Sequence, residues 1–174
     1  MKKLFTIALL ATGIMTGLNA NAQEDKSKRP SPPARVQQEL KSGALVSIEY
    51  SQPSVKGRVI GKDVEPMEGK VWRTGANEAT VFETNLPLTI MGKTLPAGKY
   101  GLFTIYNGNE VTVIFNKTWS QWGAFKYNEA EDQLRIKTKV TSNATPVEKM
   151  AFDISPGGNV TLDWGGKHVQ FMIK

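Results

Sequence analysis

A short polar and aromatic run, Val-Trp-Arg-Thr-Gly-Ala-Asn-Glu at 71–78, carries the residue types best suited to chemistry. The guanidinium of Arg73 can hold a carboxylate, phosphate or sulfate through two parallel N–H bonds. Asn77 and Glu78 can read hydroxyl or amide groups, and the ring of Trp72 suits the apolar face of a sugar. The run predicts either a site for a small anionic or sugar-like ligand, or a structural turn in which Arg73 pairs with Glu78.

Two other segments could contribute to the same site. The segment 50–58 offers a phenol ring, a carboxamide and two cations, and the segment 121–123 offers another tryptophan. The further ligand-binding residues that we predict are Tyr50, Gln52, Lys56, Arg58 and Trp122. Among them, Tyr50 and Trp122 are alternative aromatic platforms to Trp72. The leading interpretation is non-enzymatic recognition of a ligand or of a partner protein.

Residue types needed by common catalytic and metal sites are scarce. The chain has no cysteine and one histidine, His168, which excludes thiol catalysis and an all-histidine metal site. No glycine-rich phosphate loop joins a strand to a helix. We therefore predict no metal and no cofactor, assign no catalytic residue, and expect His168 to be an ordinary residue on a sheet face.

Two alternatives stay open. One is an enzyme acting on envelope glycans, which needs two carboxylates facing one cleft at roughly 5 to 10 Å. Spacing along the chain cannot fix that separation. The carboxylates available for such a pair are Glu78, Glu83, Asp153 and Asp163. The other alternative is a purely structural assembly module that joins a partner through an exposed strand edge.

Residues 1–22 have the pattern of a secretory signal peptide. Two lysines precede an apolar run at 4–18 that is too short to span a bilayer, and Ala-Asn-Ala at 20–22 suits cleavage before Gln23. No later segment could be a membrane helix. We expect an exported protein, periplasmic or secreted, and without cysteine it has no site for a lipid anchor. The formal net charge of +6 falls by two on cleavage, and in an exported protein it does not indicate nucleic acid as a partner.

The mature chain divides into a leader and one domain. Residues 23–34 mix charges with prolines and are expected to be flexible. Residues 35–174 have the length of a single domain and alternate apolar with polar residues between Gly, Pro and Asn turns. The alternating or strand-like ranges are 36–40, 46–50, 79–84, 86–91, 99–106, 110–116, 134–140, 150–154, 160–164 and 169–173. The predicted fold is all-β, an antiparallel sandwich or barrel-like domain of about nine strands.

Two connections have distinctive sequences. Asn107 and Gly108 accept positive φ and predict a tight hairpin. Residues 118–132 lack alternation and carry four aromatic residues, so we expect a long loop. Asn128 and Glu131 have capping-box spacing, which predicts one helical turn within that loop.

Four ordered motifs resemble an exported bacterial family catalogued as domain of unknown function 2911. They are YSQPSVKGR at 50–58, KVWRTGANEAT at 70–80, LPAGKY at 95–100 and QWG at 121–123. The likeness extends from about residue 35 to residue 174. It implies a compact, exported, β-rich domain common in Bacteroidetes-like bacteria. It implies no activity, substrate or catalytic residue.

Overall fold

The computed structural model describes residues 25–174, so the predicted signal peptide and the start of the leader lie outside the described residues. The described chain is nearly all-β, as predicted. Its elements are η1 (Lys26–Lys28), β1 (Pro33–Glu39), β2 (Leu45–Ser51), β3 (Ala76–Thr84), β4 (Leu88–Ile90), β5 (Lys93–Leu95), β6 (Gly98–Asn107), β7 (Glu110–Asn116), η2 (Glu129–Glu131), β8 (Asp132–Ile154) and β9 (Asn159–Met172).

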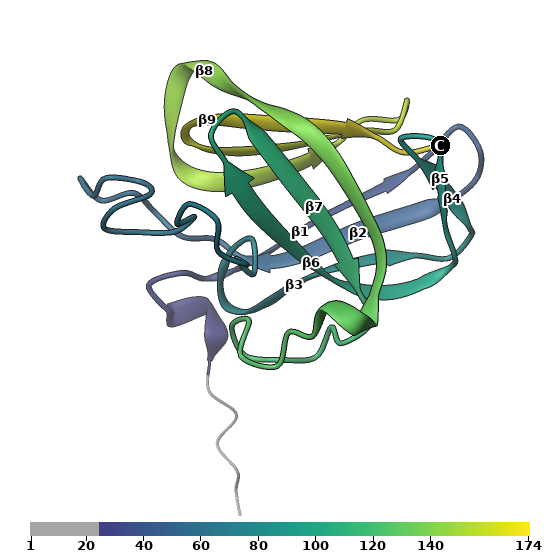
Figure 1. Ribbon diagram of the computed structural model, residues 1–174, viewed down its shortest axis with the longest axis horizontal. Coiled ribbons are helices and arrows are strands. Elements are labelled where there is room, and N and C mark those ends of the chain that lie inside the picture. Colours follow the sequence, from purple (N-terminus) through teal and green to yellow (C-terminus); the bar gives the residue numbers. More distant parts are fainter. Residues whose placement is uncertain (1–24) are drawn as a thin grey trace, which may run out of the picture.

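Seven of the strands form one antiparallel sheet in the order β1-β2-β3-β6-β7-β8-β9, and β4 pairs with β5 in a separate hairpin. Neighbours in the sheet are mostly neighbours in the chain (Figure 1). Short turns join β1 to β2, β6 to β7 and β8 to β9, whereas longer connections join β2 to β3, β3 to β6 and β7 to β8. The hairpin predicted at Asn107 and Gly108 exists one residue later. Asn107 pairs with Glu110, and the turn residues are Gly108, at φ 59°, and Asn109.

The two strands predicted at 134–140 and 150–154 are one strand, β8. Its first part pairs with β7, for example Phe115 with Leu134, and its second part pairs with β9, for example Ile154 with Val160. The residues between these two parts are mostly polar and exposed, because the strand changes there from pairing with β7 to pairing with β9. The apolar alternation therefore stops, and the sequence pattern suggested two strands. In Figure 1, β8 follows β7 and then bends over to pair with β9. This bend curls the sheet onto itself.

The strands predicted at 160–164 and 169–173 are also one strand, β9. Gly165 was expected to end the first, but it lies inside β9 at φ 56°. A Cβ at this position would approach Ile60 Cδ1 to 2.3 Å. The glycine therefore serves the close packing of the 52–75 connection against the sheet rather than a turn.

Backbone hydrogen bonds close the curled sheet at two places. After β2, the amide of Val55 donates to Glu148 O at 2.8 Å and the amide of Met150 donates to Pro53 O at 3.0 Å. Near the C-terminus, Thr89 and Lys174 exchange amide–carbonyl bonds of 2.7 and 2.9 Å. The result is a barrel-like domain, with the C-terminal end beside β4 and β5 (Figure 1).

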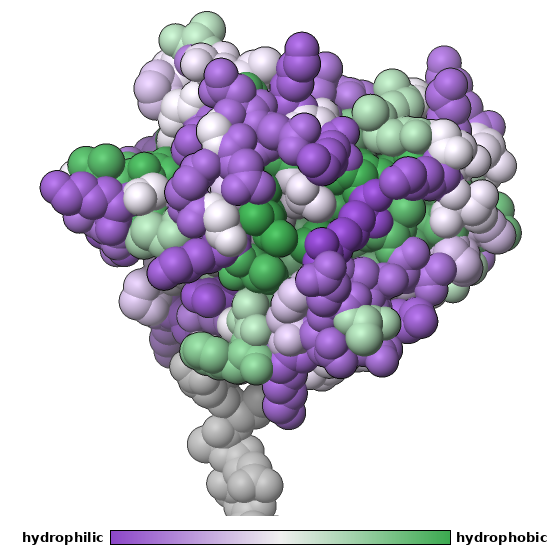
Figure 2. Space-filling view, viewed as in Figure 1, coloured by the Kyte–Doolittle hydropathy of each residue, from purple (hydrophilic) through white to green (hydrophobic). Residues whose placement is uncertain are grey.

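The main core fills the inside of the curled sheet. Its largest fully buried side chains include Trp164, Tyr106, Phe82 and Phe115. Alternation places these side chains inward and leaves polar neighbours outside. On the face viewed in Figure 2, hydrophilic residues predominate and hydrophobic residues show near the middle.

The long loop 117–131 covers part of the outer face of the sheet. Beneath it lies a second apolar cluster of Ala79, Phe103 and Ile114, with Tyr127 of the loop packed edge-on to Phe103 at 5.2 Å between ring centroids. The predicted helical turn is η2, and Asn128 caps it by accepting from the amide of Ala130. The loop is thus part of the folded structure.

Candidate functional site

Three of the four motif segments meet at one end of the sheet. Ser51 of β2 pairs with Ala76 of β3. The amide of Ala79 donates to Gln121 O, and the amide of Gly123 donates to Asn77 O, both at 2.9 Å. The fourth segment, 95–100, lies at the other end of β3. The segments 50–58, 70–80 and 121–123, which the sequence predicts to share a site, therefore lie together.

The run 71–78 is a tight turn built around its own backbone. Thr74 and Asn77 both have left-handed φ, near 53° and 54°. The Thr74 hydroxyl is 3.0 Å from the Thr104 hydroxyl, and Trp72 Nε1 donates to Gly75 O at 3.0 Å. Trp72 is 2% exposed and belongs to the core, so its ring is not a platform for a sugar.

The carboxylate of Glu78 forms ion pairs with Lys26 and Arg29 of the N-terminal segment, residues 25–32. The predicted ion pair between Glu78 and Arg73 is not found among residues 25–174. The Glu78 carboxylate accepts from Lys26 Nζ at 2.8 Å and from Arg29 Nη1 at 3.0 Å on both oxygens. Partial burial raises the pKa of Glu78, but the hydrogen bonds from Lys26, its own backbone and Arg29 outweigh that effect and lower the pKa to about 2. Glu78 is an ion-pair anchor.

Asn77 also holds the N-terminal segment. Its Nδ2 donates to Ser31 O at 3.0 Å, and the amide of Gln52 donates to the neighbouring Pro32 O at 2.8 Å. β1 begins at Pro33, two residues before the predicted start of the domain. Residues 25–32, expected as part of a flexible leader, thus contact the folded domain (lower part of Figure 1).

Arg73 lines a cavity of about 160 Å³ beneath the 52–75 connection. Its side chain is partly buried, and its Nε is fully buried without a hydrogen-bond partner. No ion pair to this guanidinium is found within residues 25–174. Desolvation lowers the pKa of Arg73, and the nearby charge of Glu65 opposes that effect in part.

Side chains in the cavity wall are fixed by hydrogen bonds that they donate to backbone carbonyls. Trp72 Nε1 donates to Gly75 O, and Trp164 Nε1 donates to Glu65 O at 2.7 Å. Arg58 also lines the cavity, and its Nε and Nη2 donate to Val55 O and Ser54 O. Arg58 and Arg73 are among the residues predicted from the sequence. Glu65 and Trp164 are not, because nothing in their local patterns separates them from ordinary loop and core residues.

The remaining predicted residues do not line this cavity. Tyr50 is 8% exposed, stacks edge-on against Phe152 and accepts from its amide. Gln52 donates to Met150 O at 2.8 Å. Lys56 is exposed at the turn after β2, and Trp122 is 54% exposed on the long loop. Trp122 is thus the predicted platform whose ring faces solvent.

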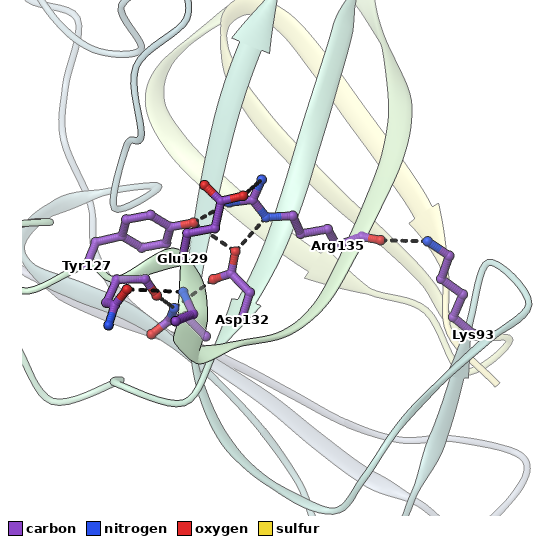
Figure 3. Close-up of polar contacts among 8 residues, drawn as sticks. Lys93, Tyr127, Glu129, Asp132 and Arg135 are labelled. Carbon is purple, nitrogen blue, oxygen red and sulfur yellow. Dashed lines mark hydrogen bonds and ion pairs between the residues drawn. The ribbon is translucent and has the colours of Figure 1, made fainter.

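A second partly buried arginine has a full set of partners (Figure 3). Arg135 bonds Asp132 at 2.5 Å, Tyr127 at 2.6 Å and Glu129 at 3.1 Å. Burial acts against its charge, yet the bonds to Asp132 and Tyr127 raise the pKa of Arg135. Burial and the bond to Asp132 raise the pKa of Tyr127 to about 12. This network fastens the long loop to β8.

Three of the four carboxylates considered for glycan hydrolysis have separate partners, and the fourth, Asp153, is exposed. Glu83 pairs with Lys99, Asp163 with His168, and Glu78 with the N-terminal cations. His168 Nδ1 lies 2.7 Å from Asp163 Oδ1 on β9.

Within residues 25–174 there is no group of three or more His, Cys, Asp or Glu residues that could hold a metal ion. The same residues contain no helix long and apolar enough to cross a membrane.

The fold and site together define a barrel-like antiparallel β domain with a small arginine-lined cavity at one end. A family model described as "Protein of unknown function (DUF2911)" matches residues 31–173. The chain therefore belongs to that family, as its four motifs predicted. No curated protein and no solved structure matches the chain.

Proposed function

We propose that this protein binds a small anion in the Arg73 cavity and catalyses no reaction there. One observation supports the proposal: a partly buried guanidinium lines a cavity and has no partner among the described residues, with its Nε fully buried. Burying a charged donor without a partner costs free energy. A bound anion would remove that cost, since a guanidinium fork matches a carboxylate, sulfate or phosphate.

The size and charge of the cavity limit the ligand. About 160 Å³ is below the roughly 300 Å³ at which pockets for larger ligands begin, so the cavity suits an ion such as sulfate, phosphate or a short carboxylate. Arg58 adds a second positive charge to the lining and Glu65 a negative one. A sugar is therefore a poor match for this cavity, although a sugar-like ligand fitted the sequence.

The proposed place of action is outside the cytoplasm, periplasmic or secreted. The support is the sequence pattern at 1–22 and the absence of cysteine for a lipid anchor. Expression of the full chain in a Gram-negative host, followed by N-terminal sequencing of the periplasmic fraction, should give a mature protein that begins at Gln23. Full-length protein in the cytoplasmic fraction would contradict this proposal.

The binding proposal is tested by thermal unfolding of the mature protein with sulfate, phosphate or acetate, at constant ionic strength. At least one anion should raise Tm in proportion to the logarithm of its concentration. R73M should lose that rise. R35M is the matched control, because Arg35 is an exposed arginine paired with Glu49.

A folded R73M protein that keeps the full anion-dependent rise would contradict the proposal. If R73M does not fold, R73K serves instead. Lysine keeps the charge but lacks the planar fork, so the anion should still bind, more weakly than to the parent. A parent protein that no tested anion stabilises would also count against the proposal.

A further inference from the structure

A second candidate site lies on the outside of the domain, where the long loop meets β3. A depression of about 390 Å³ is lined by residues that we call the aromatic groove: Glu78, Ala79, Val81, Trp119, Ser120, Gln121, Trp122 and Lys126. It shares no lining residue with the Arg73 cavity. Two tryptophans line it, and both are substantially exposed, Trp119 at 40% and Trp122 at 54%.

The two rings are presented by a loop whose backbone is fixed. Gln121 is 7% exposed, and its side chain donates to Thr118 O at 2.7 Å and accepts from the amide of Lys126 at 2.9 Å. Its carbonyl accepts from Ala79 of β3, and η2 and the Arg135 network hold the far end of the loop. Binding would not have to order this loop, which lowers the entropic cost of association.

One cation lies near the ring of each tryptophan. Lys99 Nζ lies 5.5 Å from the Trp119 ring centroid, and the Arg29 guanidinium lies 5.8 Å from that of Trp122. Lys126 lines the groove itself. The carboxylate of the groove, Glu78, is paired with Lys26 and Arg29. The surface thus combines flat aromatic faces with an excess of cations.

A second depression, of about 380 Å³, adjoins the aromatic groove. The two share Glu78, Ala79 and Val81, so together they form one elongated surface across β3. The neighbouring part adds Lys26 and Arg29, together with the Arg35–Glu49 pair. An elongated surface suits a chain of several units better than one compact molecule.

We infer that the aromatic groove binds an acidic oligosaccharide, a chain of sugars that carry carboxylates. The apolar faces of the sugar rings would stack on Trp119 and Trp122, as aromatic side chains with a wet edge permit. The carboxylates would face Lys126 and the cations of the N-terminal segment, where opposite charges attract and steer the ligand. This site is additional to the anion cavity and does not depend on it.

The test uses oligogalacturonate as the probe, with the mature protein at low ionic strength, and follows tryptophan fluorescence and heat of binding. W122A should weaken binding about tenfold, the equivalent of one lost aromatic contact. F125A is the matched control, because Phe125 is 84% exposed on the same loop but does not line the groove. R73M should bind the oligosaccharide like the parent, which separates this site from the anion cavity.

A second pair of measurements tests the charge. K126Q should weaken binding of oligogalacturonate and leave any binding of a neutral oligosaccharide of equal length unchanged, and it gives an answer even if W122A does not fold. Equal losses in F125A and W122A would overturn the inference. So would failure of the parent to bind oligogalacturonate, including the case in which it binds phosphatidylglycerol vesicles through Trp122 instead.

Discussion

Arg73 and Arg135 are both partly buried arginines of one small domain, yet their surroundings differ. Arg135 has two carboxylates and a phenol as partners, and its pKa is raised. Arg73 has a buried Nε without a partner, lines a cavity, and has a lowered pKa. The same side chain thus fastens a loop in one place and remains available for a ligand in the other. The set of partners, and not the residue type, separates a structural arginine from a candidate site.

The largest expected effect is on the structural side of this comparison. Asp132, with 7% of its side chain exposed, accepts from Asn116, Tyr127 and Arg135. D132A should lower the free energy of unfolding by about 2–4 kcal/mol, because it leaves buried donors without acceptors. Urea unfolding measures this. E129A, at a position 75% exposed, should cost less than about 1 kcal/mol, and equal losses would break the assignment of Asp132 as the centre of the network.

The comparison is most direct when both arginines are replaced by methionine. R135M should destabilise the protein by about 1–2 kcal/mol, because it removes the cation that pairs with Asp132. This figure allows for the solvent that screens the partly exposed guanidinium. R73M should change stability by less than about 1 kcal/mol, or increase it, since it removes a desolvated donor that has no partner. Chemical denaturation of the anion-free proteins measures both. Equal losses would mean that Arg73 is structural as well.

Glu78 should make the stability of the protein depend on pH in the acid range. The folded-state pKa of Glu78 is depressed from 4.5 to about 2. A depressed carboxyl pKa stabilises the fold above the unfolded-state value, and this contribution disappears as pH falls from about 4.5 towards 2. Because the side chain is 38% exposed, the effect should be on the order of 1 kcal/mol. E78Q should flatten this part of a stability–pH curve, and an unchanged slope would contradict the ion-pair role of Glu78.

The smallest expected effect distinguishes the two cations on Glu78. Lys26 has 52% of its side chain exposed and Arg29 13%, and Arg29 bonds both carboxylate oxygens. K26A should therefore cost about 0.5 kcal/mol or less, and R29A should cost more. Thermal unfolding at neutral pH measures both. A greater loss in K26A would show that the exposed lysine holds the N-terminal segment.

Much of the fold could be predicted, because alternation records which face of each strand is buried. β1, β2, β3, β6 and β7 lie close to their predicted ranges. β8 and β9 were each divided in two, because a change of partner and an internal glycine look like turns in the sequence. The short strand β5 gave no signal, since three residues are too few to show a period.

The sequence grouped segments that the structure brings together, but it did not give their contacts. The segments 50–58, 70–80 and 121–123 lie together, and Arg73 lines a cavity, while its role in binding stays a prediction. The partners were not predictable, because Glu78 reaches back to Lys26 and Arg29, far from it in sequence. The sequence likewise left open whether Trp72 or Trp122 is exposed, and the structure places Trp72 in the core.

The sequence by itself determined the all-β class, the four family motifs and the absence of thiol chemistry, because composition and local periodicity do not depend on distant contacts. Tertiary structure decided which charges are paired. The N-terminal segment and the long loop both reach β3, through the bonds of Lys26 and Arg29 to Glu78 and of Ala79 to Gln121, and no local pattern encodes these contacts. Tertiary structure thus makes Glu78 an ion-pair anchor, leaves Arg73 beside a cavity, and turns Trp119 and Trp122 towards solvent.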